Sequence, residues 1–315
     1  MQSKKKFTNT GQSAGSYTVH ECLPPDIFYY FSAVFFRDCL NFIRMKHILS
    51  LLFLFASAFA LAGQPEVLKL WPGNPAAAEA EIFVYKPENS GKAAPAVIIC
   101  PGGGYQIVSM EHEGHDFAKW FASKGFVGVV LKYRMPGGNH TIPLSDAEKG
   151  VSLIRANAAE WGVDTTRIGV VGFSAGGHLA ASLSNLASDA NRPSFAILFY
   201  PVICFDNEVT HFGSRANLLG KGVENPTLVE RYSMDKQVNE KTPKTLLFVN
   251  DDDDCVPPLN SALYYTALKG RSIPAAMYLF PNGGHGWGFR ESFPYHKEMK
   301  ELTEKWLEDM HITNK

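Results

Sequence analysis

From residue 81 onward, short runs of β-branched and aromatic residues alternate with longer amphipathic runs. Several short runs are continuously apolar, which is typical of strands buried on both faces of a parallel sheet. This alternation predicts a doubly wound α/β domain with a mostly parallel sheet and helices on both faces. Ligands of such sheets bind at the carboxyl ends of the strands. We expect strands at 81–85, 96–100, 126–133, 168–172, 195–200, 245–250 and 275–280, and helices at 113–124, 144–160, 176–188, 259–269 and 296–309.

Residues 203–243 interrupt this alternation. The segment is polar and rich in turn residues, and one short helix is expected within 221–234. We interpret it as a loop insertion between neighbouring strands. It either covers part of a site or is a surface excursion without function.

The N-terminal region has the layout of an export signal. In residues 46–62 a Lys-His pair precedes an apolar run that ends in the small-x-small sequence Ala60-Leu61-Ala62. The run is short for a transmembrane anchor, which is the alternative. Residues 1–44 show no clean periodicity, so we expect either a start-site error with translation from Met45 or a long n-region. A signal peptide over 45–62 predicts one mature domain over 63–315, periplasmic or secreted, without a membrane anchor.

Charge and cysteine content exclude several classes of protein. The formal net charge is −1 and no basic stripe appears, so nucleic-acid binding is not expected. The predicted domain holds Cys100, Cys204 and Cys255, whose spacing matches no zinc site. Three free thiols are favoured over a Cys204–Cys255 disulfide. We expect neither a metal nor a cofactor.

The sequence Gly172-Phe173-Ser174-Ala175-Gly176 matches G-x-S-x-G. The motif alone is a weak signal, but it directly follows an expected strand and opens an expected helix. A nucleophile elbow requires this strand–turn–helix setting, because a turn so tight leaves no room for bulky neighbours of the serine. We therefore predict Ser174 as a nucleophile. The alternative is a glycine-rich turn with an idle serine.

A serine nucleophile needs a base and an acid. His285 lies between glycines in the loop 282–288, after the last expected strand. Asp251, Asp252, Asp253 and Asp254 follow the preceding strand, and the order serine, aspartate, histidine is that of the α/β-hydrolases. The aspartate loop lacks the glycine and terminal glutamate of an EF-hand, so calcium is not expected. One aspartate is expected to orient His285, and the other three to be solvated bystanders.

The glycine-rich sequence at 100–105, CPGGGY, follows an expected strand at the same sheet edge. Backbone N–H groups approach an oxyanion closely only where side chains are absent. Gly102, Gly103 and Ala175 are therefore the predicted oxyanion-hole donors. A phosphate-binding loop is the rival interpretation, but the lysine and the glycine spacing of such loops are missing.

These motifs, in this order, resemble the α/β-hydrolase-fold serine esterases, and most closely the bacterial carbohydrate (xylan) acetyl esterases. The resemblance covers residues 66–310. Its D-x-x-V-P pattern implies Asp253 as the acid, because Val256 and Pro257 follow. Pro101 stands where the related H-G-G-G esterases have histidine. Glu113, Arg134 and His178 also fit the family, but helix surface, ion pairing and helix packing explain them adequately.

The resemblance implies an exported esterase that removes acetyl groups from plant polysaccharides or oligosaccharides such as acetylated xylan. An acylated carbohydrate would then be the substrate. Tyr105 and Trp287, beside the predicted catalytic loops, are expected to narrow the acyl pocket and offer stacking faces to a sugar. The alternatives are a feruloyl esterase or a small peptidase on the same fold, and a binding module with a degenerate hydrolase fold.

Overall fold

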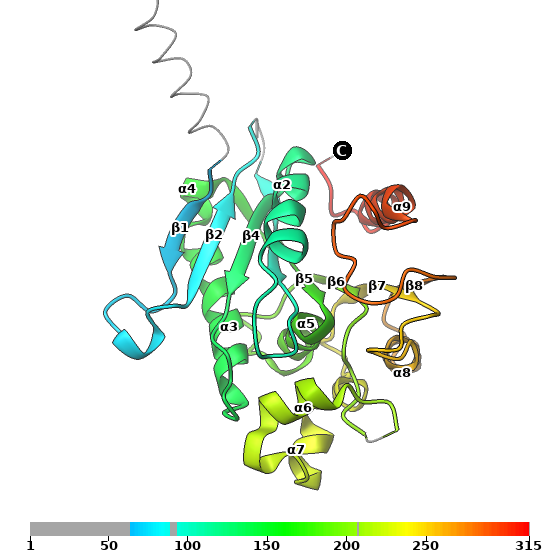
Figure 1. Cartoon of the computed structure of the whole chain (residues 1–315). Coiled ribbons are helices and arrows are strands. Elements are labelled where there is room, and N and C mark those ends of the chain that lie inside the picture. The colour runs from blue at the N-terminus through cyan, green and yellow to red at the C-terminus, as the bar shows by residue number, and fades with distance from the viewer. Residues whose placement is uncertain (1–63, 89–92, 207, 315) are drawn as a thin grey trace, which may run out of the picture. The chain divides into compact units, whose positions relative to one another are not determined.

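One eight-stranded sheet organises the part of the chain that the structure describes. The computed structural model describes residues 64–314 apart from 89–92 and 207. The strand order is β1-β2-β4-β3-β5-β6-β7-β8 (Figure 1). The strands are β1 Glu66–Lys69, β2 Glu81–Tyr85, β3 Ala94–Cys100, β4 Val127–Lys132, β5 Val163–Phe173, β6 Phe195–Phe199, β7 Lys244–Asn250 and β8 Ala275–Phe280.

The predicted α/β fold is confirmed. Strands β3 to β8 pair in parallel. Strands β2 and β1 extend the sheet beyond β4 at one edge, and both pair antiparallel. The chain passes from β3 to β4 on one side and then crosses to β5 on the other. The direction of winding therefore reverses between β3 and β5, and such a switch point is where open α/β sheets bind ligands. Strand β1 was not predicted, because its four residues are too few to show a pattern.

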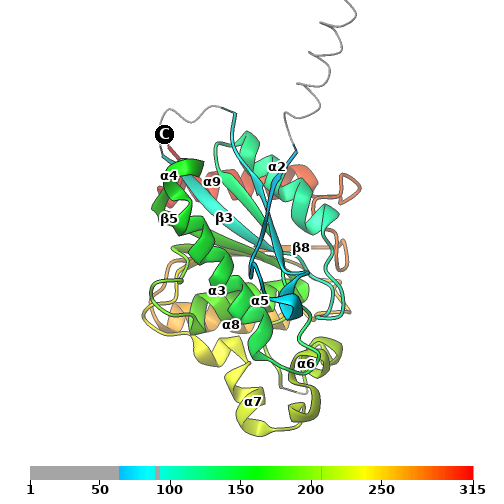
Figure 2. The same cartoon turned by 90° about the vertical axis from the view of Figure 1, so that its left-hand side faces the viewer.

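Helices cover both faces of the sheet. In Figures 1 and 2, α2 and α9 lie on one face and α3, α5 and α8 on the other. The helices are α2 Asp116–Ser123, α3 Thr141–Ala156, α4 Ala158–Trp161, α5 Ser174–Leu186, α6 Phe212–Leu219, α7 Pro226–Arg231, α8 Leu259–Gly270 and α9 His296–Asp309. Short 3₁₀ or π turns occur at Pro75–Ala77, Glu111–His115, Gly220–Gly222 and Met234–Gln237.

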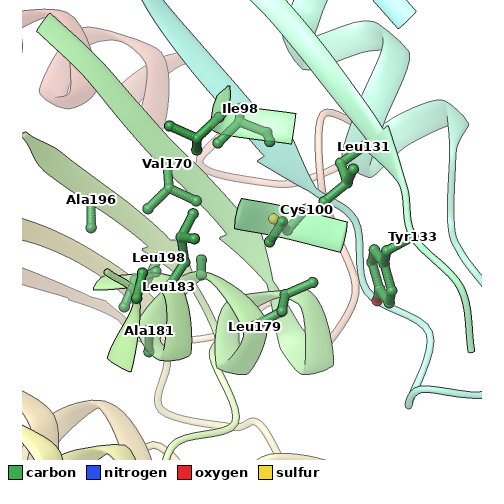
Figure 3. Close-up of a cluster of buried hydrophobic side chains, with 14 of the residues drawn as sticks. Ile98, Cys100, Leu131, Tyr133, Val170, Leu179, Ala181, Leu183, Ala196 and Leu198 are labelled. Atoms are coloured by element: carbon green, nitrogen blue, oxygen red, sulfur yellow. The ribbon is translucent and has the colours of Figure 1, made fainter. Parts of the chain in front are cut away.

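The two faces of the sheet form separate core layers, because successive side chains of a strand point to opposite faces. In β3, Ile98 belongs to the layer beneath α3, α5 and α8, whereas Val97 belongs to the layer beneath α2 and α9. Figure 3 shows the first layer, where Val170 and Leu198 of the sheet lie near Leu183 of α5. This packing fixes the strand ends from which the site is built.

The segment 203–243 contains more structure than expected. The predicted helix within 221–234 is present as α7, but α6 and two 3₁₀ turns were not predicted. The buried apolar residues of α6 are Leu218 and Leu219. Two apolar positions are too few to show the helical period of about 3.6 residues in the sequence. In the described range, Cys100, Cys204 and Cys255 are free thiols.

The predicted signal peptide lies outside the described residues, so the boundaries at 44 and 62 remain predictions. The described residues belong to one unit that begins at Gln64. Among the helices of this part of the chain, none has the length and apolarity needed to traverse a bilayer.

Candidate active site

Ser174 lies at the sharp turn between β5 and α5. Its backbone φ is 53°, a left-handed conformation that is costly for a residue with a side chain and recurs at nucleophile elbows. A methyl group on Gly172 would come within 2.5 Å of the Gly176 carbonyl oxygen, and one on Gly176 would collide with the Cys100 carbonyl oxygen. Glycine therefore flanks the serine because backbone occupies the space of a side chain.

The structure brings Ser174, His285 and Asp253 together in one hydrogen-bonded line. The Ser174 Oγ lies 2.8 Å from His285 Nε2, and His285 Nδ1 lies 2.7 Å from Asp253 Oδ2. A carboxylate only accepts, so Nδ1 carries the proton and Nε2 is free to accept from the serine hydroxyl. This arrangement can activate the serine for attack on a carbonyl carbon.

Asp253 is the buried member of the four aspartates, with 3% of its surface exposed. Its Oδ1 accepts hydrogen bonds from the backbone N–H groups of Cys255, at 3.1 Å, and Val256, at 2.9 Å. Its carboxylate is thus held in place while Oδ2 faces the histidine.

Asp252 is exposed, as expected of a solvated residue, but it is not a bystander. Its two carboxylate oxygens accept from the N–H groups of Gly283, at 3.1 Å, and Gly284, at 2.8 Å, in the loop that carries His285. These bonds lower the pKa of Asp252, the Gly284 bond most strongly. Asp251 and Asp254 are exposed.

The glycine loop after β3 is held by its carbonyl groups. The Gly102 carbonyl accepts from the Ser109 N–H, the Gly103 carbonyl from two later N–H groups, and the Gly104 carbonyl from Asn217 Nδ2 at 2.8 Å. Among the described residues, neither the Gly103 N–H nor the Ala175 N–H has an acceptor. The N–H of Ala175 is free because it belongs to the first turn of α5.

The expectation that Gly102 is an oxyanion donor is wrong for this geometry. The Gly102 N–H donates to Glu113 Oε2 at 2.8 Å and so is not available to an oxyanion. Glu113 was expected on a helix surface, but it is 3% exposed. Gly103 and Ala175 remain the predicted donors.

Tyr200 connects Glu113 to the histidine loop. Its hydroxyl donates to Glu113 Oε1 at 2.7 Å and accepts from the Gly288 N–H at 2.9 Å. Burial, together with the Glu113 carboxylate, raises the pKa of Tyr200 well above its usual value, so the hydroxyl keeps its proton. The Tyr200 ring also packs edge-on against His285, with the ring centroids 4.7 Å apart.

Tyr105 and Trp287 are not available as substrate-stacking faces, which corrects that expectation. Tyr105 is 2% exposed, and its hydroxyl bonds to Nδ1 of the buried His178 at 2.8 Å. Trp287 is 3% exposed and stacks on Phe293 at a centroid separation of 3.9 Å. Both rings are core residues that support the loops around them.

The insertion is attached to the glycine loop and to α8. Asn217 of α6 holds the glycine loop, as described above, and the buried Asn260 of α8 donates to the Val209 carbonyl at 2.7 Å.

Arg134 pairs with the buried Asp146 at 2.7 Å, which is the ion-pairing role expected of it. In the described ranges, no group of three or more His, Cys, Asp or Glu residues is placed to bind a metal ion.

Glu113, Tyr200 and Asp252 support the site but were not predicted from the sequence. Tyr200 directly follows β6 at the carboxyl edge of the sheet, so the rule that located the catalytic loops applies to it. No sequence pattern marks Glu113, because its burial depends on how the turn Glu111–His115 packs over the glycine loop.

This chain is similar to several known proteins. The family model BD-FAE matches residues 82–216. An acetylxylan esterase from Xylanibacter ruminicola is 37% identical over 236 residues, which cover 74% of this chain and 48% of that protein. An endo-1,4-β-xylanase B from Butyrivibrio fibrisolvens is 35% identical, over 65% of this chain and 34% of that protein. The chain therefore spans less than half of either of these relatives.

A solved structure matches over nearly its full length. The acetyl ester-xyloside bifunctional hydrolase from Caldicellulosiruptor lactoaceticus superposes with a TM-score of 0.73 at 35% identity. The match covers 81% of this chain and 99% of that one.

Proposed function

Because the chain belongs to the family of α/β-hydrolase-fold esterases, we propose that it hydrolyses acetyl esters on plant polysaccharides or their oligosaccharides, such as acetylated xylan. The observation that carries this proposal is the continuous line of hydrogen bonds from Ser174 through His285 to Asp253. The names of the relatives supply the substrate class.

In the proposed reaction, Ser174 Oγ attacks the ester carbonyl carbon while His285 Nε2 takes the hydroxyl proton. Asp253 holds the ring in the required tautomer and stabilises the imidazolium. The N–H groups of Gly103 and Ala175 stabilise the negative oxygen. The C–O bond to the sugar then breaks, and His285 returns its proton to the leaving oxygen. Water, deprotonated by His285, cleaves the acetyl-enzyme to acetate and regenerates the serine.

We also propose that the protein is exported, because residues 46–62 have the layout of a signal peptide. Polymeric xylan does not enter cells, so an esterase acting on it or on its larger fragments must meet it outside the cytoplasm. The same enzyme without export would act only on imported oligosaccharides.

The test compares the parent enzyme with Ser174→Ala. We expect the parent to release acetate from acetylated xylan, to prefer nitrophenyl acetate over butyrate and octanoate, and to react with a fluorophosphonate probe. Each extra methylene is expected to disfavour the ester by about 1–3 kcal/mol. Ser174→Ala is expected to lose all three activities. Release of ferulate without acetate, or a preference for octanoate, would contradict the proposed substrate.

A further inference from the structure

His211 lies at the start of α6, where the insertion meets the glycine loop. Its Nδ1 accepts from the Ser214 backbone N–H at 3.2 Å and lies 2.8 Å from the Ser214 hydroxyl. Because Nδ1 accepts an N–H bond, the proton of the neutral ring is on Nε2. Among the described residues, no atom accepts a hydrogen bond from this Nε2–H.

The ring of His211 lies beside the glycine loop. A Cβ built on Gly104 would lie 3.9 Å from His211 Cε1, the atom next to Nε2. Asn217, on the helix that follows His211, donates to the Gly104 carbonyl. This bond fixes the position of the His211 ring relative to the glycine loop. Burial lowers the pKa of His211 more than the Asp253 carboxylate raises it, so at neutral pH the ring is a neutral donor.

Phe212 follows His211 and offers an exposed apolar face. It is 56% exposed, and it is the only aromatic among the large apolar side chains that are exposed in the described part of the chain. The guanidinium of the buried Arg215 lies 5.9 Å from the centroid of its ring. Since Arg215 is buried, it lies beneath the inner face and leaves the outer face open. Ile107 of the glycine loop and Leu259 of α8 are also exposed.

The ring of His211 lies beside Gly104, the neighbour of the predicted oxyanion donor Gly103, so it borders the place of the ester group. His285 must return its proton to the leaving oxygen, so the leaving alcohol lies beside His285. A sugar has apolar C–H faces bordered by hydroxyl groups, and an aromatic face next to one hydrogen-bond donor matches that chemistry.

We propose that His211 and Phe212 bind the sugar that carries the ester, with His211 Nε2–H donating to a sugar oxygen and Phe212 stacking on the sugar ring. The inference rests on the proposed function, since it names the place of the sugar in that reaction. It replaces the predicted stacking faces of Tyr105 and Trp287, which are buried.

The test compares a sugar ester with an ester of the same acyl group that lacks a sugar. We would measure kcat/KM for an acetylated xylooligosaccharide and for ethyl acetate in the parent, His211→Asn and Phe212→Ala. Asparagine is a good helix N-cap, so His211→Asn keeps a bond to Ser214 but cannot reach as far as Nε2. Leu279→Ala, at an exposed position on the edge strand β8, is the matched control.

We expect the ratio of the two kcat/KM values, sugar ester over ethyl acetate, to fall about tenfold in each variant, mainly through KM. Leu279→Ala should leave the ratio unchanged. The parent could release acetate from the sugar ester while His211→Asn and Phe212→Ala both show the same ratio of kcat/KM values as the parent. That result would overturn this inference and leave the proposed function intact. If the parent hydrolyses ethyl acetate but no acetylated sugar, the proposed substrate itself is wrong, and the inference is overturned with it.

Discussion

Glu113 accepts a hydrogen bond of 2.7 Å from the Tyr200 hydroxyl, although the two residues are far apart in the sequence. The other carboxylate oxygen of Glu113 accepts from Gly102, and the Tyr200 hydroxyl accepts from Gly288. One buried carboxylate therefore links the glycine loop to the loop that carries His285. The predicted oxyanion donor Gly103 and the base His285 belong to these two loops, so the separation between them depends on this link.

Replacing Glu113 by glutamine should lower kcat more than it changes KM. A glutamine accepts through one oxygen only, so its NH₂ group would face either the Gly102 N–H or the Tyr200 hydroxyl. We expect kcat for nitrophenyl acetate to fall about tenfold or more and the free energy of unfolding to fall by about 2 kcal/mol. Glu111→Gln, in the same turn but exposed, is the control. A folded Glu113→Gln enzyme with the parent's kcat would contradict the positioning role.

The four consecutive aspartates should respond very differently to conversion into asparagine. We expect Asp253→Asn to reduce kcat by about 10⁴-fold, because an amide no longer selects the required tautomer of His285. Asp252→Asn should cost several-fold, since it weakens the bonds to Gly283 and Gly284 that position the histidine loop. Asp251→Asn and Asp254→Asn should retain the parent's activity. A crippling effect at Asp254 would show that the D-x-x-V-P register is wrong.

The sequence predicts those parts of the molecule that follow from local patterns. The buried strands appear as continuous apolar runs, so seven of the eight described strands were predicted, although β5 begins at Val163, five residues before the predicted start. The predicted places of Ser174 and His285 follow from the rule that ligand sites lie at the carboxyl ends of strands. Asp253 was chosen among four neighbours through the resemblance to a family, not through the residues alone.

The errors concern contacts between distant segments. The Gly102 N–H bonds to Glu113, and Tyr105 and Trp287 are buried by residues of other elements. A sequence shows that a glycine leaves its N–H accessible, but it does not show which acceptor reaches that N–H first. Long-range hydrogen bonds of this kind depend on packing of the whole sheet.

Gly176→Ala should destabilise the protein, although alanine is the better helix former by about 1 kcal/mol. At this position an added methyl group would collide with the carbonyl oxygens of Cys100 and Pro101, and backbone cannot move aside cheaply. We expect the free energy of unfolding to fall by about 2 kcal/mol or more in a urea titration. Gly270→Ala is the control, because a methyl group there meets nothing within 4 Å. It should be neutral or slightly stabilising, and equal effects at the two positions would contradict the steric explanation.

His178 should make the stability of the protein fall as the pH falls below neutral. The ring is completely buried in α5, where Nδ1 accepts from the Tyr105 hydroxyl and Nε2 donates to the Tyr232 carbonyl, both at 2.8 Å. Burial lowers the pKa of His178 to about 4. In the unfolded chain a histidine takes up its proton near pH 6.5. Between these values only the unfolded state binds the proton, so acidification favours unfolding.

The size of this effect can be isolated with His178→Gln, which can hydrogen-bond at the same place but does not titrate. From pH 7 to pH 5, we expect the parent to lose about 2 kcal/mol more of its free energy of unfolding than the variant loses. Urea titrations of both proteins at the two pH values give this difference, and other groups cancel because both chains carry them. Equal losses would contradict the prediction. So would an NMR titration in which the His178 ring resonance of the folded parent shifts with a midpoint near pH 6.5.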